Sequence, residues 1–225
     1  MARRAKAATD SRNDEEDVML GKMNRRAALR LGLLATASVV TRPGIARSAP
    51  ECRPTEPDTQ GPFYLPGAPT RIALAAPDEP GDRLVVRGRV LRPDCRTPLA
   101  GALLDVWQAD ASGRYHGATE QYRLRGRLRT DSTGSWELTT IRPGNYRLGA
   151  GMRPAHLHFL VSHPAHPPLV TQLYFRGDPY LGPHDACGEA CKSGDPHRVI
   201  GLGREEIMGR EVFVGRFDVV LGAGA

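Results

Sequence analysis

The sequence predicts an all-β protein, a single β-sandwich domain of short, mostly antiparallel strands joined by long loops. Short segments alternate between apolar and polar residues, and turn residues separate them at short intervals. No long stretch shows a helical period. With 25 Gly and 19 Pro among 225 residues, the chain is rich in the residues that build turns. A chain of this length is long enough to bury one hydrophobic core.

The predicted strands begin after a proline-rich segment. Residues 83–91 partly alternate, residues 102–108 are mostly apolar, and residues 135–141 alternate cleanly between apolar and polar side chains. Further strands are predicted at 145–148, 155–162, 171–175 and 212–220. We therefore expect residues 83–225 to form the β-sandwich and residues 49–82 to form a Pro-rich arm docked on it.

The first 48 residues differ in composition from the rest. Arg25 and Arg26 begin a twin-arginine pattern, an apolar run covers 31–40, and residues 46–48 form a small-x-small cleavage site. Residues 1–48 are therefore predicted to be a twin-arginine export signal with a disordered N-terminal extension. The expected location is periplasmic or extracellular, with the twin-arginine translocase as a partner during export. A basic amphipathic tail is the alternative, and an over-long start site is an alternative for the first 22 residues.

The formal charge of +6 does not indicate a nucleic-acid partner. Residues 1–48 hold 10 of the 31 basic and 5 of the 25 acidic residues, so the remainder carries a net charge of +1. A polyanion-binding domain would concentrate basic residues in its folded part. We therefore predict no nucleic-acid partner.

The four cysteines all follow the predicted cleavage site. An even number of cysteines in an exported protein indicates disulfides, and four allow three pairings. We favour Cys52–Cys95, which ties the arm to a turn, and Cys187–Cys191, which closes a small loop. A zinc cluster is the alternative, although the chain has no Cys-x-x-Cys pair.

The segment 153–159 predicts a metal site on a strand. Side chains alternate across a strand, so His156 and His158 project from one face while Leu157 and Phe159 project from the other. Two imidazoles on one face indicate a pair of metal ligands. Arg153 beside them adds a positive charge suited to an anionic group.

Three other segments carry matching polar residues. One runs from a strand into Gly113-Arg114-Tyr115, a second contains Pro143-Gly144-Asn145-Tyr146, and a third places Gln172 on a neighbouring strand. Together with Arg-Pro-Ala-His-x-His, these motifs resemble the intradiol ring-cleaving dioxygenases, the catechol and protocatechuate dioxygenase family. The resemblance covers roughly residues 55–180 and includes their order and spacing.

The resemblance implies a ligand set and an activity. Tyr115, Tyr146, His156 and His158 would hold one non-haem Fe(3+) ion per chain, since phenolate oxygen suits this hard cation. The enzyme would insert both atoms of O2 into an aromatic diol and cleave the ring between the hydroxylated carbons. Tyr146 would be the ligand that leaves and accepts a proton.

The resemblance also assigns residues around the iron. Arg153 would face the substrate ring and stabilise negative charge, and Gln172 would orient Arg153. Pro62 and Tyr64 would form one wall of the substrate pocket. Catechol, protocatechuate and hydroxyquinol all remain possible substrates, and the oligomeric state stays open.

Two other functions are alternatives for a β-sandwich with these residues. A cupin metal site also uses His-x-His on strands, but it needs a glutamate shortly downstream, and none occurs between Glu137 and Glu189. A non-catalytic exported β-sandwich, such as a transthyretin-like binding module, has no reason to combine two tyrosines, two histidines and an arginine in this order.

Overall fold

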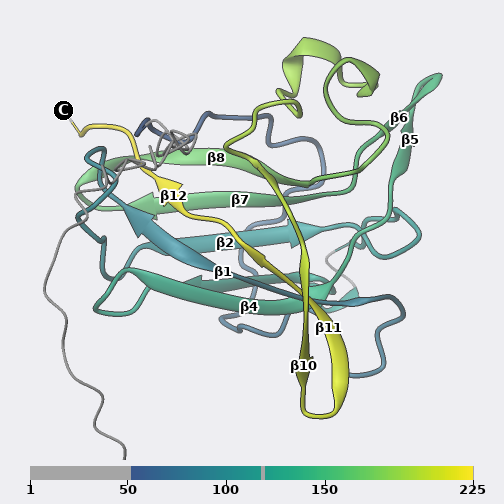
Figure 1. Cartoon of the computed structure of the whole chain (residues 1–225), viewed down its shortest axis with the longest axis horizontal. Coiled ribbons are helices and arrows are strands. Elements are labelled where there is room, and N and C mark those ends of the chain that lie inside the picture. The colour runs from purple at the N-terminus through teal and green to yellow at the C-terminus, as the bar shows by residue number, and fades with distance from the viewer. Residues whose placement is uncertain (1–51, 118–119, 225) are drawn as a thin grey trace, which may run out of the picture. The chain divides into compact units, whose positions relative to one another are not determined.

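Alternating and apolar segments form the strands of two facing sheets in the computed structural model, which describes residues 52–117 and 120–224 (Figure 1). The predicted export signal lies outside these residues. The strands of the first sheet are β1 (Arg83–Leu91), β4 (Ser135–Ile141), β10 (Gly203–Ile207), β11 (Arg210–Arg216) and β12 (Val219–Val220). Those of the second are β2 (Leu103–Gln108), β3 (Arg125–Arg129), β7 (His156–His163), β8 (His166–Phe175) and β9 (Val199–Ile200).

The remaining elements lie at one end of the sandwich. Strands β5 (Tyr146–Leu148) and β6 (Gly151–Arg153) form a separate two-stranded hairpin. Two short 3-10 helices, η2 (Gly182–His184) and η3 (Gly188–Ala190), follow β8. Figure 1 shows this loop at the same end of the molecule as the β5–β6 hairpin, and a bridge between Met152 and Asp185 joins the two.

The hydrophobic core fills the space between the sheets. Leu84, Val86 and Leu138 from the first sheet cluster with residues of the second, and all are buried. In the centre, the Phe159 ring lies 5.6 Å from Trp136 and 5.5 Å from Phe217, measured between ring centroids. The inward residues of each strand thus meet as the alternation predicts. The predicted all-β sandwich is confirmed.

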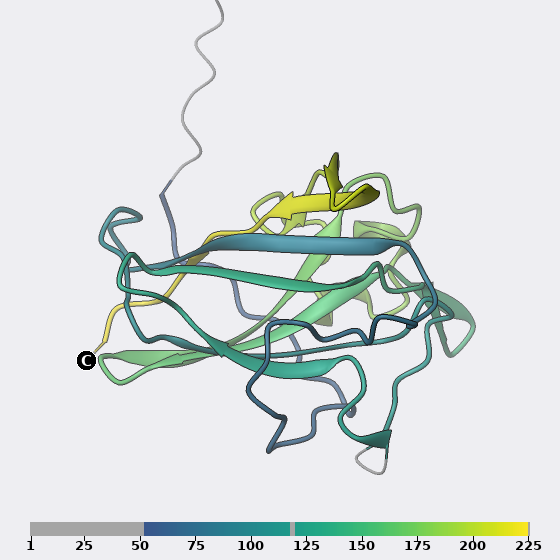
Figure 2. The same ribbon diagram turned by 90° about the horizontal axis from the view of Figure 1, so that it is seen from below.

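Most strand pairs are antiparallel, as expected. The exceptions are β1–β11, β1–β12 and β8–β9, which are parallel. Figure 2, a quarter turn from the first view, shows β11 in yellow beside the blue strand β1. The predicted strand 212–220 is broken in two, because the Asp218 side chain accepts the Arg89 amide at 2.9 Å. That carboxylate replaces a backbone partner between β11 and β12.

Strand β3 was not predicted because its sequence is Arg-Gly-Arg-Leu-Arg. Its arginines are satisfied by backbone carbonyls: Arg127 donates to Ala68 at 2.5 Å and Arg129 to Gly101 at 2.9 Å. Strand β10 is exposed along its whole length, so it lacks an apolar alternation. Strand β6 has only three residues, too few to show a period.

The arm of residues 52–82 is hydrogen-bonded to both sheets. Leu74 donates to Thr139 of β4 and Asp58 donates to Val170 of β8, each at 2.9 Å. The structure contains the disulfides Cys52–Cys95, which ties the arm to the turn after β1, and Cys187–Cys191. In the described ranges, no helix is long and apolar enough to cross a membrane.

Candidate metal centre

The two histidines of β7 lie side by side between the neighbouring strands. His158 pairs with Trp107 of β2 and Gln172 of β8, and His156 pairs with Tyr174 of β8. Both histidines are buried, with 2% of their surface exposed. The Trp107 indole stacks on the His158 ring at 4.7 Å between centroids and 6° between planes. Stacking of Trp107 from β2 therefore fixes the orientation of the His158 imidazole.

Three donor atoms from the predicted ligands converge at one point. Tyr115 Oη, His156 Nε2 and His158 Nε2 each lie 3.1 Å from the other two. The centre of this triangle is about 1.8 Å from each atom, its side divided by √3. Because metal–imidazole bonds measure about 2.0–2.1 Å, a metal ion fits slightly above the plane of these atoms.

The second tyrosine borders this triangle. The Tyr146 ring centroid lies 5.7 Å from those of both Tyr115 and His156. Tyr146 is half-buried and begins strand β5, opposite Arg153 of β6. All four predicted ligands thus line one site, and two of them are oxygen donors.

Burial keeps the two imidazoles neutral. It lowers the pKa of His156 to about 3, helped by the charge of Arg153, and lowers the pKa of His158 well below its ordinary value. His156 Nδ1 lies 2.7 Å from the Pro154 carbonyl, which requires Nδ1 to carry the proton. The lone pair of His156 Nε2 is therefore available to a metal ion.

Burial acts in the opposite direction on the tyrosines. It raises the pKa of Tyr115, with a further increase from Tyr146, and it raises the pKa of Tyr146. The positive charge of Arg153 partly opposes both increases. A phenolate at this site therefore needs a nearby cation, which is the condition that a bound metal ion supplies.

Close backbone packing brings the two tyrosine loops together. A Cβ on Gly144 would lie 2.3 Å from the Ala111 carbonyl oxygen, and one on Gly113 would lie 2.2 Å from that of Asn145. Only glycine permits these approaches. The Gly144 amide also donates to the Asp110 carbonyl at 2.9 Å. The glycines of both motifs thus serve the contact between the loops.

His116 anchors the loop that carries Tyr115. Its Nε2 lies 2.9 Å from Asp110 Oδ2, and its Nδ1 lies 2.6 Å from Glu120 Oε2. The imidazole is fully buried between these two carboxylates. The sequence offered no role for His116, because both partners are polar loop residues with no pattern of their own.

Arg153 is held at the edge of the centre by several polar groups. Its Nη2 donates to Gln172 Oε1 at 2.9 Å and to Tyr174 Oη at 3.3 Å. Tyr174 Oη also donates to Asp58 Oδ2 at 2.9 Å. Arg153 Cζ lies 6.0 Å from the Tyr146 ring centroid. The predicted pair of Arg153 and Gln172 is therefore in contact.

Two acidic residues that stabilise this region were missed by the sequence analysis. Asp178 Oδ2 accepts from Asn145 Nδ2 at 2.7 Å and from the Ala155 amide at 2.9 Å. Asp185 Oδ1 lies 2.9 Å from Arg153 Nε. An aspartate after a strand, as at Gly177-Asp178-Pro179, resembles an ordinary turn in sequence, so neither role could be recognised there.

The arm contributes the segment predicted to line the substrate pocket. Phe63 stacks on Tyr115 with a centroid distance of 4.2 Å and an interplanar angle of 8°. Tyr64 packs on Trp107 at 4.9 Å and donates to Asp105 at 3.1 Å. Phe63, rather than Tyr64, therefore contacts the predicted ligands directly. Pro62 lies immediately before it in the chain.

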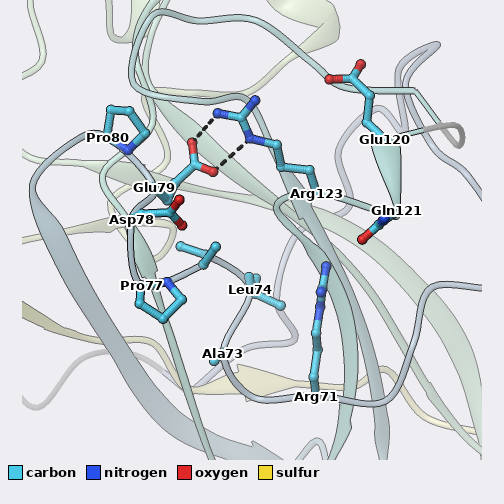
Figure 3. Close-up of a pocket in the computed structure, with 12 residues that line it drawn as sticks. Arg71, Ala73, Leu74, Pro77, Asp78, Glu79, Pro80, Glu120, Gln121 and Arg123 are labelled. Carbon is cyan, nitrogen blue, oxygen red and sulfur yellow. Dashed lines mark hydrogen bonds and ion pairs between the residues drawn. The ribbon is translucent and has the colours of Figure 1, made fainter.

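A cavity of about 610 Å³ elsewhere contains none of the predicted site residues. Figure 3 shows it between the arm and residues 120–123, with the bidentate ion pair of Arg123 and Glu79 at 2.7 Å. Arg71 in its wall donates to the carbonyls of Tyr122 and Arg125. Both arginines are thus already paired within the protein.

The donor set favours a centre that uses tyrosine. Over residues 52–117 and 120–224, no group of three or more His, Cys, Asp or Glu side chains could hold a metal ion. The four cysteines form disulfides, which contradicts the zinc-cluster alternative. Two imidazole nitrogens beside two phenol oxygens fit a hard, highly charged cation.

Comparison with known proteins identifies similar chains. A family model described as "Dioxygenase" matches residues 59–223. Over 152 residues the chain is 40% identical to the chlorocatechol 1,2-dioxygenase of Rhodococcus opacus, a match covering 57% of this chain. The chain spans only 58% of that relative's length.

Solved structures agree with this comparison. The crystal structure of 3-chlorocatechol 1,2-dioxygenase from Rhodococcus opacus 1CP superimposes with a TM-score of 0.67 at 31% identity, covering 76% of this chain and 74% of that one. The dioxygenase domain of a dioxygenase carbohydrate-binding protein fusion from Streptomyces sp. SirexAA-E gives a TM-score of 0.62 at 36% identity, covering 76% of this chain and 99% of that one.

Proposed function

This chain belongs to the intradiol ring-cleaving dioxygenase family, and we propose that it cleaves the ring of a catechol-type diol between its two hydroxylated carbons. Both atoms of O2 enter the product, a muconate-type diacid. The observation that carries this proposal is the convergence of Tyr115 Oη, His156 Nε2 and His158 Nε2, each 3.1 Å from the others. A non-catalytic binding module does not account for this convergence.

The proposed cofactor is one non-haem Fe(3+) ion held by Tyr115, Tyr146, His156 and His158. Two phenolates offset two of the three positive charges of this cation, and two neutral imidazoles complete the proposed ligand set. When bound, ferric iron withdraws electron density from a coordinated catecholate and makes its ring reactive toward O2. The low pKa of His156, about 3, keeps its nitrogen ligand free of protons at neutral pH.

We assign Tyr146 the role of a proton acceptor. A catechol that binds through both oxygens must lose two protons, and one must go to a base in the site. Tyr146 lies at the border of the donor triangle, and burial raises its pKa. Wherever no cation stabilises its phenolate, burial therefore favours the protonated phenol, and the Tyr146 Oη would hold the proton after substrate binds.

Arg153 is proposed to stabilise negative charge on the substrate. Its guanidinium is buried, and Gln172 and Tyr174 bind its Nη2. A fixed positive charge in a site that excludes water stabilises developing negative charge without reorganisation. Gln172 also donates to the Thr59 carbonyl at 2.7 Å, so the arm and β8 together orient the arginine.

Substrate selection is assigned to the arm segment. Phe63 covers the Tyr115 ring, and we assign Phe63 and its neighbour in the chain, Pro62, to the wall of the substrate pocket. The named relatives act on catechols and chlorocatechols, which supports a catechol without a carboxylate group. Tyr64 packs against Trp107, which stacks on His158, and donates a hydrogen bond to Asp105, so it stabilises the site without being a proposed ligand.

Export through the twin-arginine translocase remains part of the proposal, with the enzyme acting in the periplasm or outside the cell. Two disulfides support an oxidising compartment. Purified periplasmic protein that lacks residues 1–48 would verify the route. Full-length protein found only in the cytoplasm would contradict it.

The activity can be tested with an oxygen electrode. We expect O2 uptake with catechol or hydroxyquinol and less with protocatechuate, which carries a carboxylate, and we expect ring-opened diacids by mass spectrometry. The protein should be red-brown, because tyrosinate-to-iron charge transfer absorbs visible light. A folded, correctly processed protein that stays colourless and iron-free after growth in iron-rich medium would refute the proposal.

A further inference from the structure

Arg153 has a buried counter-charge in Asp185. The Asp185 carboxylate is fully buried, and its Oδ1 lies 2.9 Å from Arg153 Nε. The contact is ionic rather than a well-aligned hydrogen bond, since neither Arg153 Nε nor Asp185 Oδ2 has a hydrogen-bond partner within the described part of the chain. Asp58, the carboxylate behind Tyr174, is already paired with the buried Arg198. Asp185 thus neutralises the edge of Arg153 that Gln172 does not contact.

Asp185 belongs to a loop that is attached directly to β6. The Ala186 amide donates to the Met152 carbonyl at 2.9 Å, one residue before Arg153. A Cβ on Gly151 would lie 2.9 Å from the Ala186 Cβ, so the two backbones are in close contact. A shift of this loop would therefore move both the carboxylate and the strand that carries the arginine.

A disulfide closes the same loop. Asp185 Oδ1 accepts the Cys187 amide at 2.9 Å, and Cys187 is bonded to Cys191 across η3. Neither η2 nor η3 buries a residue, and within residues 182–191 the apolar burial comes from Cys191, a member of the disulfide itself. The covalent bond and a few backbone hydrogen bonds are what hold Asp185 in position.

We propose that Asp185 is a positioning residue for Arg153 and that the Cys187–Cys191 disulfide keeps Asp185 in place. This inference rests on the proposed ring cleavage. The disulfide contributes to the reaction through one chain of contacts, from Cys187 to Asp185 to the guanidinium. The other disulfide, Cys52–Cys95, ties only the start of the arm to the turn after β1. Between it and Thr59, the amides of Thr55 and Asp58 donate to Val220 and Val170, each at 2.9 Å, and hold the arm without the disulfide.

Two variants test this chain of contacts in the full-length, iron-loaded protein. Asp185→Asn keeps the acceptor for the Cys187 amide but removes the charge, and Cys187→Ser with Cys191→Ser removes the bond. We expect each to lower kcat for catechol by about 10- to 100-fold, the usual effect of losing a partner that orients a ligand or catalytic group. KM and iron content should change little, because Arg153 acts on charge that develops during the reaction.

The matched control is Cys52→Ser with Cys95→Ser. It removes a disulfide of the same kind, and kcat should stay within about two-fold of wild type even if stability falls. Equal losses of kcat in both double-serine variants would overturn the role of the Cys187–Cys191 bond. An unchanged kcat in Asp185→Asn would overturn the role of Asp185.

A double-mutant cycle separates positioning from general stability. In an Arg153→Ala background, Asp185→Asn should cause almost no further loss of kcat, since the group it positions is gone. A loss as large as in the wild-type background would refute the proposal. The residual activity of Arg153→Ala is the reference for this comparison. The difference between the effects of Asp185→Asn in the two backgrounds measures the coupling between Asp185 and Arg153.

Hydrogen exchange provides a readout that does not depend on ring cleavage. By mass spectrometry, amide exchange in residues 151–156 should be faster in Asp185→Asn and in the Cys187/Cys191 variant than in the Cys52/Cys95 control. Unchanged exchange would refute the structural coupling. Absence of diol cleavage by the wild-type protein would instead refute the proposed function, while the exchange result would still decide whether the loop positions Arg153.

Discussion

The amide of Gly144 lies in the loop before Tyr146 and donates to the carbonyl of Asp110, in the loop before Tyr115. This hydrogen bond of 2.9 Å joins two segments that are 34 positions apart in the sequence. It depends on a close backbone approach, in which the Gly144 Cα faces the Ala111 carbonyl. The distance between the two predicted tyrosine ligands is therefore set by the backbone.

Replacing Gly144 should separate the tyrosine loops. A Cβ would lie 2.3 Å from the Ala111 oxygen, so Gly144→Ala should cost about 1–3 kcal/mol in the free energy of unfolding and weaken iron binding. Thermal or urea unfolding and iron analysis measure these effects. Gly222→Ala, where nothing lies within 4 Å, is the neutral control. Normal iron content in stable Gly144→Ala protein would contradict this account.

A second glycine separates loss of stability from loss of the site. Gly88→Ala would place a Cβ 1.8 Å from the Phe217 carbonyl oxygen, in the core of the first sheet. It should destabilise the protein as much as Gly144→Ala does. The fraction that remains folded should nevertheless bind iron normally, because Gly88 lies in β1 and contacts neither tyrosine loop.

Replacing Tyr115 and replacing Tyr146 should have different effects on iron retention and on the visible absorbance spectrum. Tyr115 Oη lies 3.1 Å from both histidine nitrogens, so Tyr115→Phe should lower iron retention by at least about 10-fold. Tyr146→Phe should keep more iron and shift or weaken the visible charge-transfer band. Metal analysis and absorbance spectra of the two variants, compared at equal protein concentration, provide the test. Identical iron loss in both would contradict the separate roles.

Asp178 should couple the loop of Tyr146 to the histidine strand. Asp178→Ala leaves Asn145 Nδ2 and the Ala155 amide without their acceptor, and we expect a loss of about 2–4 kcal/mol in unfolding free energy. Iron affinity should fall with it, as measured by competition with a chelator.

Asp131→Ala is the matched control for Asp178. Its carboxylate also accepts two backbone amides, from Thr133 at 2.7 Å and Ser135 at 3.0 Å, but in an exposed turn. Some stability should be lost, while iron affinity stays unchanged. Weaker iron binding in Asp131→Ala would show that loop stability in general, rather than Asp178, controls the centre.

Lowering the pH should destabilise the loop that carries Tyr115, because it protonates the Asp110 carboxylate. Burial alone would raise the pKa of Asp110, but hydrogen bonds from Ser112, Arg114 and His116 outweigh it and lower the pKa to about 2. The unfolded chain binds this proton near pH 3.8, so the stabilisation is complete above that pH and is lost as the pH falls toward 2. Unfolding free energies of wild type and Asp110→Asn, measured from pH 5 to 2, should converge. Parallel pH profiles would contradict this role.

The strands were predicted where apolar residues alternate, as in β1 and β4, whose bounds match the prediction. The prediction failed where strands lack that pattern. In β3, arginines replace apolar side chains because the carbonyls of Phe63, Ala68 and Gly101 receive them. Whether such partners exist depends on how the arm folds, and local sequence carries no sign of it.

The residues of the candidate site also fall into those that could be predicted from the sequence and those that could not. The four proposed ligands could be named from their motifs, because metal ligation restricts residue type and local spacing. They are His156, His158, Tyr115 and Tyr146. The residues that hold them in place could not be named. Asp178 follows strand β8 and Asp185 follows the short helix η2, and nothing in their neighbourhood distinguishes them from ordinary turn residues.

The sequence by itself determined the fold class and the donor chemistry, since strand alternation and ligand type are local properties of the chain. Only the tertiary structure decided that Tyr115 Oη and both Nε2 atoms lie 3.1 Å apart, and that Asp185 neutralises Arg153. The contacts of Tyr115 with the two histidines, and of Arg153 with Asp185, join residues 32 to 43 positions apart. Their distances follow from how strands, loops and disulfides pack, a property of the whole chain that no single segment contains.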